Sequence, residues 1–231
     1  SEAFQLGKFI NQEKLEGVGL DLVISGSGFL RKGASFTANG NLHFIDFNGY
    51  RYKGIQLNGS FKQEAFLGLV TIIDTNLRAK FEGKINLNKK KTVSKFNLEV
   101  KLANLAVLNI FNKSDSLTKI SFQSEFDFEG VGIDDISGTA VISNLKYSDL
   151  KLNHTIEEFS LLANRKEEKR NIQLNSSFVD AKLEGSYSLK QLPSVFENVF
   201  HQFIIDSTYE QHKISPQELD FAIDFKNTKA I

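Results

Sequence analysis

Apolar and polar residues alternate along most of this chain with a period of two. In the segment 36–44 every second position is Phe, Ala, Gly or Leu, and the positions between carry Thr, Asn or His. The segments 96–102, 120–128, 136–142 and 219–225 alternate in the same way. A strand with this pattern has one dry face and one wet face, which is typical of antiparallel sheets. The sequence therefore predicts a mainly β protein built of antiparallel strands.

One stretch of the pattern returns about 102 residues further along the chain. Residues 79–87 read AKFEGKINL, and residues 181–189 read AKLEGSYSL. Self-similarity at a fixed period indicates that one supersecondary unit has been duplicated. We expect a first repeat unit at 1–104, a second at 105–192 and the beginning of a third at 193–231, each with a short helix followed by a meander of strands.

Three short segments depart from the alternation and space their apolar residues as a helix does. They lie at 4–10, 105–111 and 194–203, at equivalent places in the three units. Pro193 and Ser194 form a start signal for the third helix. We expect this helix to dock on the sheet through its apolar side chains, because they are too many and too large to leave in water. These side chains are Val195, Phe196, Val199, Phe200 and Phe203.

The alternation changes phase at 45–46 and again at 143–144, and each change predicts a bulge or a bend. Residues 165–170 read RKEEKR and contain no apolar side chain. This run predicts an exposed hairpin loop, and we expect its charges to be dispensable.

Composition narrows the classes of partner. The chain has 28 basic and 28 acidic residues, which argues against nucleic acid as the main partner, because phosphate binding needs a cationic surplus. The longest apolar run, 67–73, is far shorter than the ~20 residues that span a bilayer. Residues 1–20 lack the layout of a signal peptide. We expect any membrane anchor or export signal to lie in another part of a longer chain.

No group of side chains in the sequence indicates catalysis. His43, His154, His201 and His212 lie on different predicted elements, with no ligand spacing between them. The glycines of 25–28 match neither a nucleophile elbow nor a phosphate-binding loop. We expect a protein that is not an enzyme and that uses no cofactor and no metal.

The apolar stripe of the strands is the feature with functional potential. Apolar faces of two sheets usually close on one another as a sandwich core. Stacked repeats instead form one elongated curved sheet, whose inner face is a continuous apolar trough. With roughly 14 strands at ~4.8 Å spacing, the trough would be about 65 Å long. The residues expected to line it are Phe36, Leu42, Phe44, Ile55, Leu57, Leu77, Phe81, Ile85, Leu87, Phe96, Leu98, Val100, Leu102, Ile120, Phe122, Phe126, Phe128, Ile142, Ile172, Leu174, Val179, Leu183, Tyr187, Leu189, Phe221 and Ile223.

Several features follow one another in a fixed order along the chain. They are a short helix, the Gly-ended strands at 24–28 and 128–130, the strands around Tyr50 and Tyr147, and Asp74-x-Asn76 leading to 81–83. This order resembles the TamB branch of the AsmA-like proteins, in the form found in Bacteroidota, and the resemblance covers nearly the whole chain through its repeats. The second unit departs from it, with Ser176 and Phe178 in the places of Asp74 and Asn76, so the resemblance assigns no role to Asp74.

Membership in this family would imply a periplasmic protein, tethered to the inner membrane by a part of the chain not present here, with a taco-shaped β groove. Such proteins are associated with phospholipid movement to the outer membrane and with assembly of outer-membrane proteins. We expect the groove to carry phospholipid acyl chains passively between the membranes, since burying each methylene is worth ~0.8 kcal/mol. Two alternatives stay open. One is an assembly factor whose free sheet edge templates strands of an outer-membrane barrel partner, and the other is a closed all-β structural or adhesive module.

Overall fold

The computed structural model describes residues 14–27, 33–86, 92–110, 118–130, 133–150, 152–195, 198 and 213–226. They form one sheet of twelve strands, in which every strand pairs with its neighbours in sequence. All of these pairs are antiparallel, which confirms the predicted class. The elements are β1 (Leu15–Ser27), β2 (Ser35–Phe47), β3 (Tyr50–Lys62), β4 (Ala65–Ile73), β5 (Leu77–Asn86), β6 (Thr92–Asn104), β7 (Lys119–Gly130), η1 (Ile133–Asp135), β8 (Ser137–Ser148), β9 (Asn153–Lys166), β10 (Lys169–Ser176), β11 (Val179–Ser186) and β12 (Glu218–Phe225).

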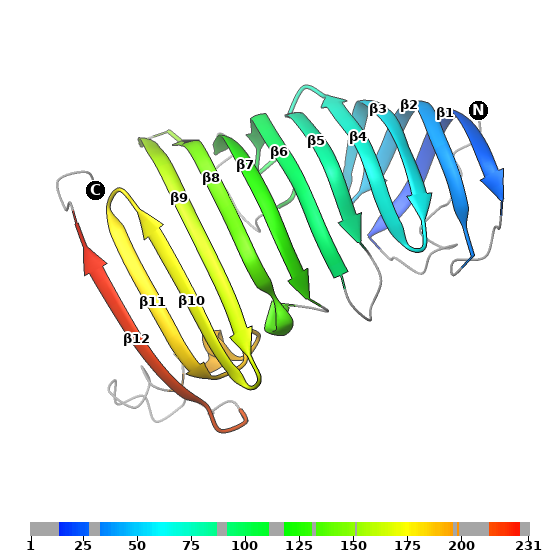
Figure 1. Cartoon of the computed structure of the whole chain (residues 1–231). Coiled ribbons are helices and arrows are strands. Elements are labelled where there is room, and N and C mark those ends of the chain that lie inside the picture. Colours follow the sequence, from blue (N-terminus) through cyan, green and yellow to red (C-terminus); the bar gives the residue numbers. More distant parts are fainter. Residues whose placement is uncertain are drawn as a thin grey trace.

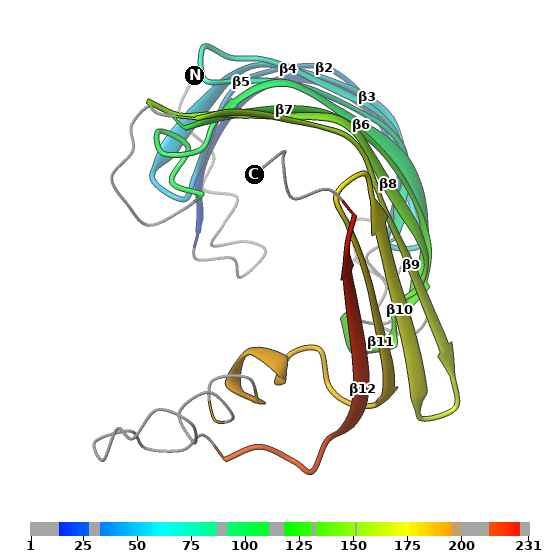
Figure 2. The same cartoon turned by 90° about the vertical axis from the view of Figure 1, so that its left-hand side faces the viewer.

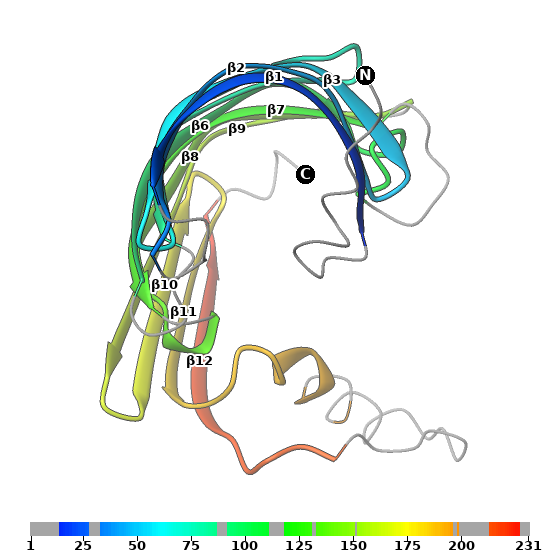
Figure 3. The ribbon, with the colours of Figure 1, turned by 90° about the vertical axis from the view of Figure 1, so that its right-hand side faces the viewer.

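The strands lie side by side from β1 at one end of the sheet to β12 at the other (Figure 1). Viewed along the row of strands, the sheet bends into an open arch with a concave and a convex side (Figures 2 and 3). The strand ends form two rims of this arch. We call the rim with residues 48–49, 74–76, 105–110, 149–150 and 152 the upper rim, and the rim with residues 63–64, 133–136, 167–168 and 187–195 the lower rim, as they lie in Figure 1.

The face with the apolar stripe is the concave one. Leu105 and Leu108, in the turn after β6, are buried together with Val100 and Ala103, and Leu77 packs against this cluster. This turn lies on the concave side of the arch, at the upper rim (Figures 2 and 3). Because opposed residues of an antiparallel pair project to the same face, the strand register then assigns a face to every paired position.

The helix predicted at 105–111 is a single turn, and residue 111 lies outside the described part of the chain. The N–H of Leu108 donates to the carbonyl of Asn104 at 3.1 Å, and the N–H of Ile110 donates to the carbonyl of Leu105 at 3.1 Å. Asn109 has a φ of 54° and donates its N–H to Ala106 at 3.2 Å. This pair of bonds around a left-handed residue is the Schellman motif, which ends a helix.

The other two predicted helices are described in part or not at all. Residues 4–10 lie outside the described residues. At the third site, residues 192–195 and 198 are helical, on the concave side at the lower rim (Figures 2 and 3). Val195 is half-buried there, whereas Phe196, Val199, Phe200 and Phe203 have no described side chain.

Bulges occur near both predicted phase changes. The register of β1 with β2 shifts between the positions opposite Phe44 and Leu42, just before the predicted place. The register of β7 with β8 shifts between Lys146 and Ser143, and Asn144 has a φ of 53°. An inserted residue in one strand flips the alternation, as the sequence indicated.

The charged run at 165–170 lies in an exposed hairpin, as predicted. Its outer residues belong to β9 and β10, and a two-residue turn at 167–168 joins these strands. Its two arginines face the concave side and have partners, since Arg165 forms an ion pair with Asp135, and Arg170 Nε donates to the carbonyl of Asp134 at 2.8 Å. The prediction that this run is dispensable stays a prediction, and the contacts of Arg165 and Arg170 with η1 argue against it for these two residues.

Candidate functional site

One row of residues crosses the concave face from β1 to β12, perpendicular to the strands. Each strand contributes one residue, and each residue is opposed to the next across a register pair. All twelve are Ala, Gly, Ile, Leu or Phe, so the row contains no charged group and no side-chain hydrogen-bond donor or acceptor. The row consists of Ile24, Ala38, Gly59, Gly68, Gly83, Phe96, Phe126, Ala140, Leu161, Leu174, Ala181 and Ile223.

A second row, one step nearer the upper rim, is almost as apolar. It runs through β1 to β10 and contains two polar residues, both serines. Both are buried, at 4 % and 8 % exposure for Ser124 and Ser176. The hydroxyl of Ser124 donates to the carbonyl of Leu98 at 3.0 Å, and that of Ser176 accepts the N–H of Val179 at 3.0 Å. These serines thus satisfy their hydroxyls on the backbone and present no polar group to the concave side. The row consists of Leu22, Gly40, Leu57, Val70, Phe81, Leu98, Ser124, Ile142, Phe159 and Ser176.

Aromatic rings touch one another across the middle of this face. The ring centroids of Phe66 and Phe81 are 6.0 Å apart, those of Phe81 and Phe96 5.1 Å, and those of Phe96 and Phe126 4.8 Å. Tilted and stacked pairs at these distances add about 0.5–1.5 kcal/mol each beyond the burial of their area. The rings are only half-buried, so they keep apolar surface for a further contact.

Glycines make room for these rings. A Cβ on Gly59 would lie 2.5 Å from the ring of Phe66. At Gly83, whose φ is 141°, a Cβ would lie 2.5 Å from the Cα of Phe96 on the next strand. A larger residue at either position would therefore push the strands or the rings out of place.

The two end strands expose large apolar side chains on the same face. On β12, Phe221, Ile223 and Phe225 are 63 %, 55 % and 60 % exposed. On β1, Leu20 and Ile24 are 42 % and 56 % exposed. Each end strand has a neighbour on one side alone in the described sheet. Exposed apolar patches larger than those of ordinary surfaces are typical of interaction sites.

Most of the predicted lining residues do share the concave face. The register pairs and the packing around Leu105 and Leu108 place them there. This group consists of Phe36, Leu42, Ile55, Leu57, Leu77, Phe81, Ile85, Phe96, Leu98, Val100, Ile120, Phe122, Phe126, Phe128, Ile142, Ile172, Leu174, Val179, Leu183, Phe221 and Ile223.

Two predicted lining residues point the other way. A bulge in β6 places Leu102 opposite Arg78, on the convex face. The guanidinium of Arg51 lies 4.2 Å from the ring centroid of Phe44. Arg51 stands between two tyrosines that pack on the concave cluster, so Arg51 and Phe44 face the convex side. In both cases a shift of one residue reverses the face.

Three other predicted lining residues are not among the described exposed or half-buried residues of the concave face. Leu87 lies outside the described residues. Tyr187 is on the concave side but buried, with the guanidinium of Arg170 5.6 Å from its ring centroid. Leu189 lies at the lower rim, where its N–H donates to Asp134 Oδ1 at 2.6 Å.

The lining predicted from the sequence did not include residues of β4 and β9, although Phe159 and Leu161 of β9 lie in the concave rows. Val70 and Ile72 of β4 oppose Phe81 and Ala79. Residues 67–73 are apolar at nearly every position, so the pattern did not indicate which of them face the concave side. The pairing of β4 with the clearly alternating β5 was the signal that could have assigned them.

An aspartate organises the upper rim. Asp74 is 7 % exposed and accepts three hydrogen bonds, from the hydroxyl of Tyr50 at 2.5 Å, the N–H of Lys53 at 3.1 Å and the N–H of Asn76 at 2.8 Å. Burial raises the pKa of Tyr50, and the bond to Asp74 raises this pKa further. Asp74 thus ties the turn before β5 to the start of β3.

A different aspartate organises the lower rim. Besides the N–H of Leu189, Asp134 accepts the hydroxyl of Ser188 at 3.1 Å. Ser188 is 54 residues away in sequence from Asp134. These bonds hold the start of the segment 187–195 against η1 and so position its helical residues on the concave side (Figure 3).

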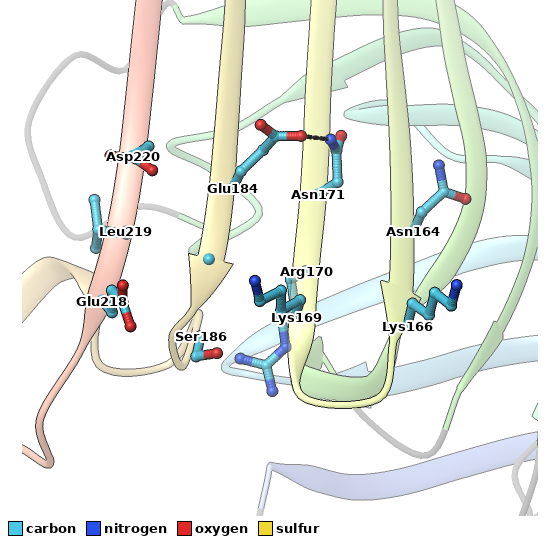
Figure 4. A pocket seen from close by; sticks show the side chains of 11 residues that line it. Asn164, Lys166, Lys169, Arg170, Asn171, Glu184, Ser186, Glu218, Leu219 and Asp220 are labelled. Atoms are coloured by element: carbon cyan, nitrogen blue, oxygen red, sulfur yellow. Dashed lines mark hydrogen bonds between the residues drawn. The ribbon is translucent and has the colours of Figure 1, made fainter.

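A polar depression near β9 to β12 is unlike the concave face (Figure 4). Lys166 and Lys169 lie on one side of it and Glu218 and Asp220 on the other, with Asn171 donating to Glu184 between them. Its charges are balanced and its side chains do not converge on one point. Among the described residues, no cluster of three or more His, Asp or Glu side chains could hold a metal ion, and no helix has the length and apolarity to cross a membrane.

Comparison with known proteins adds no family. No family model matches the chain, and neither a curated protein nor a solved structure matches it. The function is therefore inferred from the apolar concave face and its surroundings.

Proposed function

We propose that this chain is a segment of a periplasmic TamB/AsmA-like protein whose concave face is a groove that carries phospholipid acyl chains between the inner and outer membranes. The role is non-enzymatic. Acyl chains lie against the apolar rows, and head groups stay in water on the open side of the arch (Figure 2).

The observation that carries the proposal is the row of twelve uncharged residues, one from every strand. A closed core would bury such a row under a second layer. Here its members on the end strands are exposed, and the central Phe rings are half-buried. Twelve strands at ~4.8 Å spacing give a path of roughly 50 Å.

Passive movement follows from the uniformity of the rows. Each methylene that leaves water gains ~0.8 kcal/mol wherever it lies along an apolar lining. The two serines of the second row form hydrogen bonds with the backbone, so they provide no strong binding site at which a moving acyl chain would be held. Direction would then come from the supply and removal of lipid at the two ends.

The strand layout supports an origin by repetition. Features recur six strands apart: β3–β4 and β9–β10 are joined by two-residue turns at 63–64 and 167–168, and the similar sequences 79–87 and 181–189 begin in β5 and β11. Bulges fall at corresponding places, in β2 and in β8. In an array of such units, each unit extends the same groove.

The test uses two neighbouring leucines on opposite faces of β9. Leu161 opposes Ala140 and Leu174 on the concave face, whereas Leu162 opposes Thr139 and Gln173 on the convex face. Leu161→Asp puts a charge in the apolar row, and Leu162→Asp adds the same charge outside it. We expect native mass spectrometry to find phospholipid on the parent chain and on Leu162→Asp, and far less on folded Leu161→Asp. A parent chain that takes up no lipid, or equal lipid on both variants, would refute the proposal.

The free edges favour a second candidate. The apolar side chains of β12 stand beside an edge that has no partner strand in the described sheet. Such an edge could template a strand of an outer-membrane barrel. This role predicts no bound lipid and equal behaviour of Leu161→Asp and Leu162→Asp in binding a barrel strand peptide.

A further inference from the structure

We propose that the convex face carries a binding site for a phosphoryl group, centred on Ser121 and formed by Lys101, Lys119 and Lys146. The site is a depression near the upper rim, across β6 to β9. It lies on the opposite side of the sheet from the apolar rows, so it does not rest on the proposed lipid groove.

Two register shifts bring the lysines together. The bulge in β6 places two residues, Lys101 and Leu102, beside Ser121 of β7. On the other side of Ser121, the register of β7 with β8 places Lys146 directly opposite it. Lys119 precedes Ser121 by two positions on β7, so it shares its face. Ser121 therefore has a lysine on each neighbouring strand and a third two positions before it on its own strand.

Charge distinguishes this depression from the others. The depression in Figure 4 and the one beside Asp134 are each lined by both acids and bases. The lining of this one includes three lysines and no carboxylate. Lys101 has a long contact with Glu99, at 3.8 Å. Within the described part of the chain, neither Lys119 nor Lys146 has a carboxylate within 4.0 Å. Like charges side by side on a sheet cost stability, and a bound anion would offset that cost.

The neutral groups of the lining fit an oxyanion. The hydroxyls of Ser121, Ser148 and Thr155 and the amide of Asn153 line the same depression. Hydroxyl and amide donors complement the several oxygens of a phosphoryl group, and lysine binds phosphate as a mobile point charge. Several cations and several neutral donors around one hollow favour a phosphoryl group over a single carboxylate.

Two sources could supply this group, a phospholipid head group or free phosphate. The test first follows the Ser121 amide by NMR while inorganic phosphate is added to the purified chain. It then measures flotation of the chain with phosphatidylglycerol vesicles and with phosphatidylcholine vesicles. Saturable shifts at Ser121 with phosphate support the site. Both lipids carry a phosphoryl group and phosphatidylglycerol alone has a net negative charge, so flotation with phosphatidylglycerol identifies a lipid head group as the source when the lysine variant described next loses it and the matched control keeps it.

The variant is Lys119→Gln with Lys146→Gln. Its matched control is Lys80→Gln with Lys182→Gln, which removes the same total charge from the convex face at positions paired with Glu82 and Glu184. We expect the variant to lose affinity by about tenfold or more and the control to change by less than about twofold.

A third variant, Ser121→Asp, tests the site independently in case the double variant loses phosphate binding because it misfolds. It places a carboxylate at the centre of the lysines and should abolish the phosphate shifts while the fold is kept. Absence of any saturable shift in the parent, or an equal loss in variant and control, would overturn the site.

Discussion

The two rims of the arch hold their concave-side segments by different means. At the upper rim, the turn 105–110 is fixed by apolar burial, with Leu108 at 1 % exposure inside a cluster of strand residues. At the lower rim, the segment 187–195 buries the ring of Tyr187 and is also held by hydrogen bonds from Ser188 and Leu189 to Asp134. The upper turn places Leu105 and Leu108 in one buried cluster, whereas one buried ring and two polar contacts hold the lower segment. We therefore expect the lower segment to open at a lower free-energy cost than the upper turn.

The largest effect should come from the apolar turn. Leu108→Ala removes a fully buried side chain and should lower the free energy of unfolding by about 2–5 kcal/mol. Val107→Ala is the control, since Val107 is adjacent but 37 % exposed, and it should cost under about 1 kcal/mol. Urea unfolding monitored by circular dichroism measures both. Equal costs would mean that the turn does not form the described cluster.

The next effect should come from the polar contact. Asp134→Ala leaves the N–H of Leu189 and the hydroxyl of Ser188 without their acceptor, at a cost of about 1–3 kcal/mol. Hydrogen exchange at Leu189 should accelerate, while exchange in β3 to β6 stays unchanged. Asp135→Ala, which removes an ion pair with a more exposed carboxylate, should change exchange at Leu189 little. Global loss of protection in Asp134→Ala would show that this rim is as integral as the other.

The tyrosines at the two rims should respond in opposite directions to loss of a charged neighbour. Burial raises the pKa of Tyr187, and Arg170 lowers it, whereas at Tyr50 both burial and Asp74 raise the pKa. Asp74→Asn should therefore lower the pKa of Tyr50, and Arg170→Met should raise that of Tyr187. Tyrosine NMR titration measures both, and shifts of the same sign would contradict the assignment.

The same tyrosines give the pH dependence of stability. A tyrosine whose pKa is raised on folding contributes stability that is complete below the unfolded pKa, about 10, and is lost as pH rises through the folded value. Unfolding midpoints of the parent chain should therefore fall above about pH 10. Asp74→Asn should weaken this fall, because it brings the folded pKa of Tyr50 closer to its unfolded value.

The smallest effect should come from the turn between β9 and β10. Lys169→Ala removes an exposed charge and should change the free energy of unfolding by less than about 0.5 kcal/mol. Arg170→Ala, its neighbour, should cost more, since Arg170 contacts both Asp134 and Tyr187. Chemical unfolding measures the loss of stability in both variants. A larger loss for Arg170→Ala than for Lys169→Ala would show that Arg170 helps to hold the lower rim.

The sequence predicted the faces of the sheet where alternation was clean. Phe81 and Phe126 were placed correctly because their strands alternate without interruption. Leu102 and Phe44 were placed on the wrong face because a single inserted residue reverses every later position in a strand. A bulge is a shift in the pairing of two strands, so the apolar pattern of one strand alone does not identify the inserted residue.

Contacts at the rims could not be predicted in the same way. Asp134 and Ser188 meet only because four intervening strands, β8 to β11, return the chain to the same rim. The predicted helix at 105–111 shortened to one turn because Asn109 adopts a left-handed conformation, which the apolar spacing does not report. Local pattern thus determined the strands, and the segments that join them depended on the assembled sheet.

The pairing of every strand with its sequence neighbours alone has a consequence for how such a chain changes over evolutionary time. A hairpin of two strands can be inserted or removed between any two neighbouring strands. Every strand of the resulting sheet then still pairs with its neighbours in sequence. Such an event changes the length of the sheet by about 9.6 Å and keeps the direction of every later strand. Loss of a single strand would instead reverse the direction of the rest of the chain. Hairpins, taken two strands at a time, are therefore the unit in which this architecture can be lengthened or shortened.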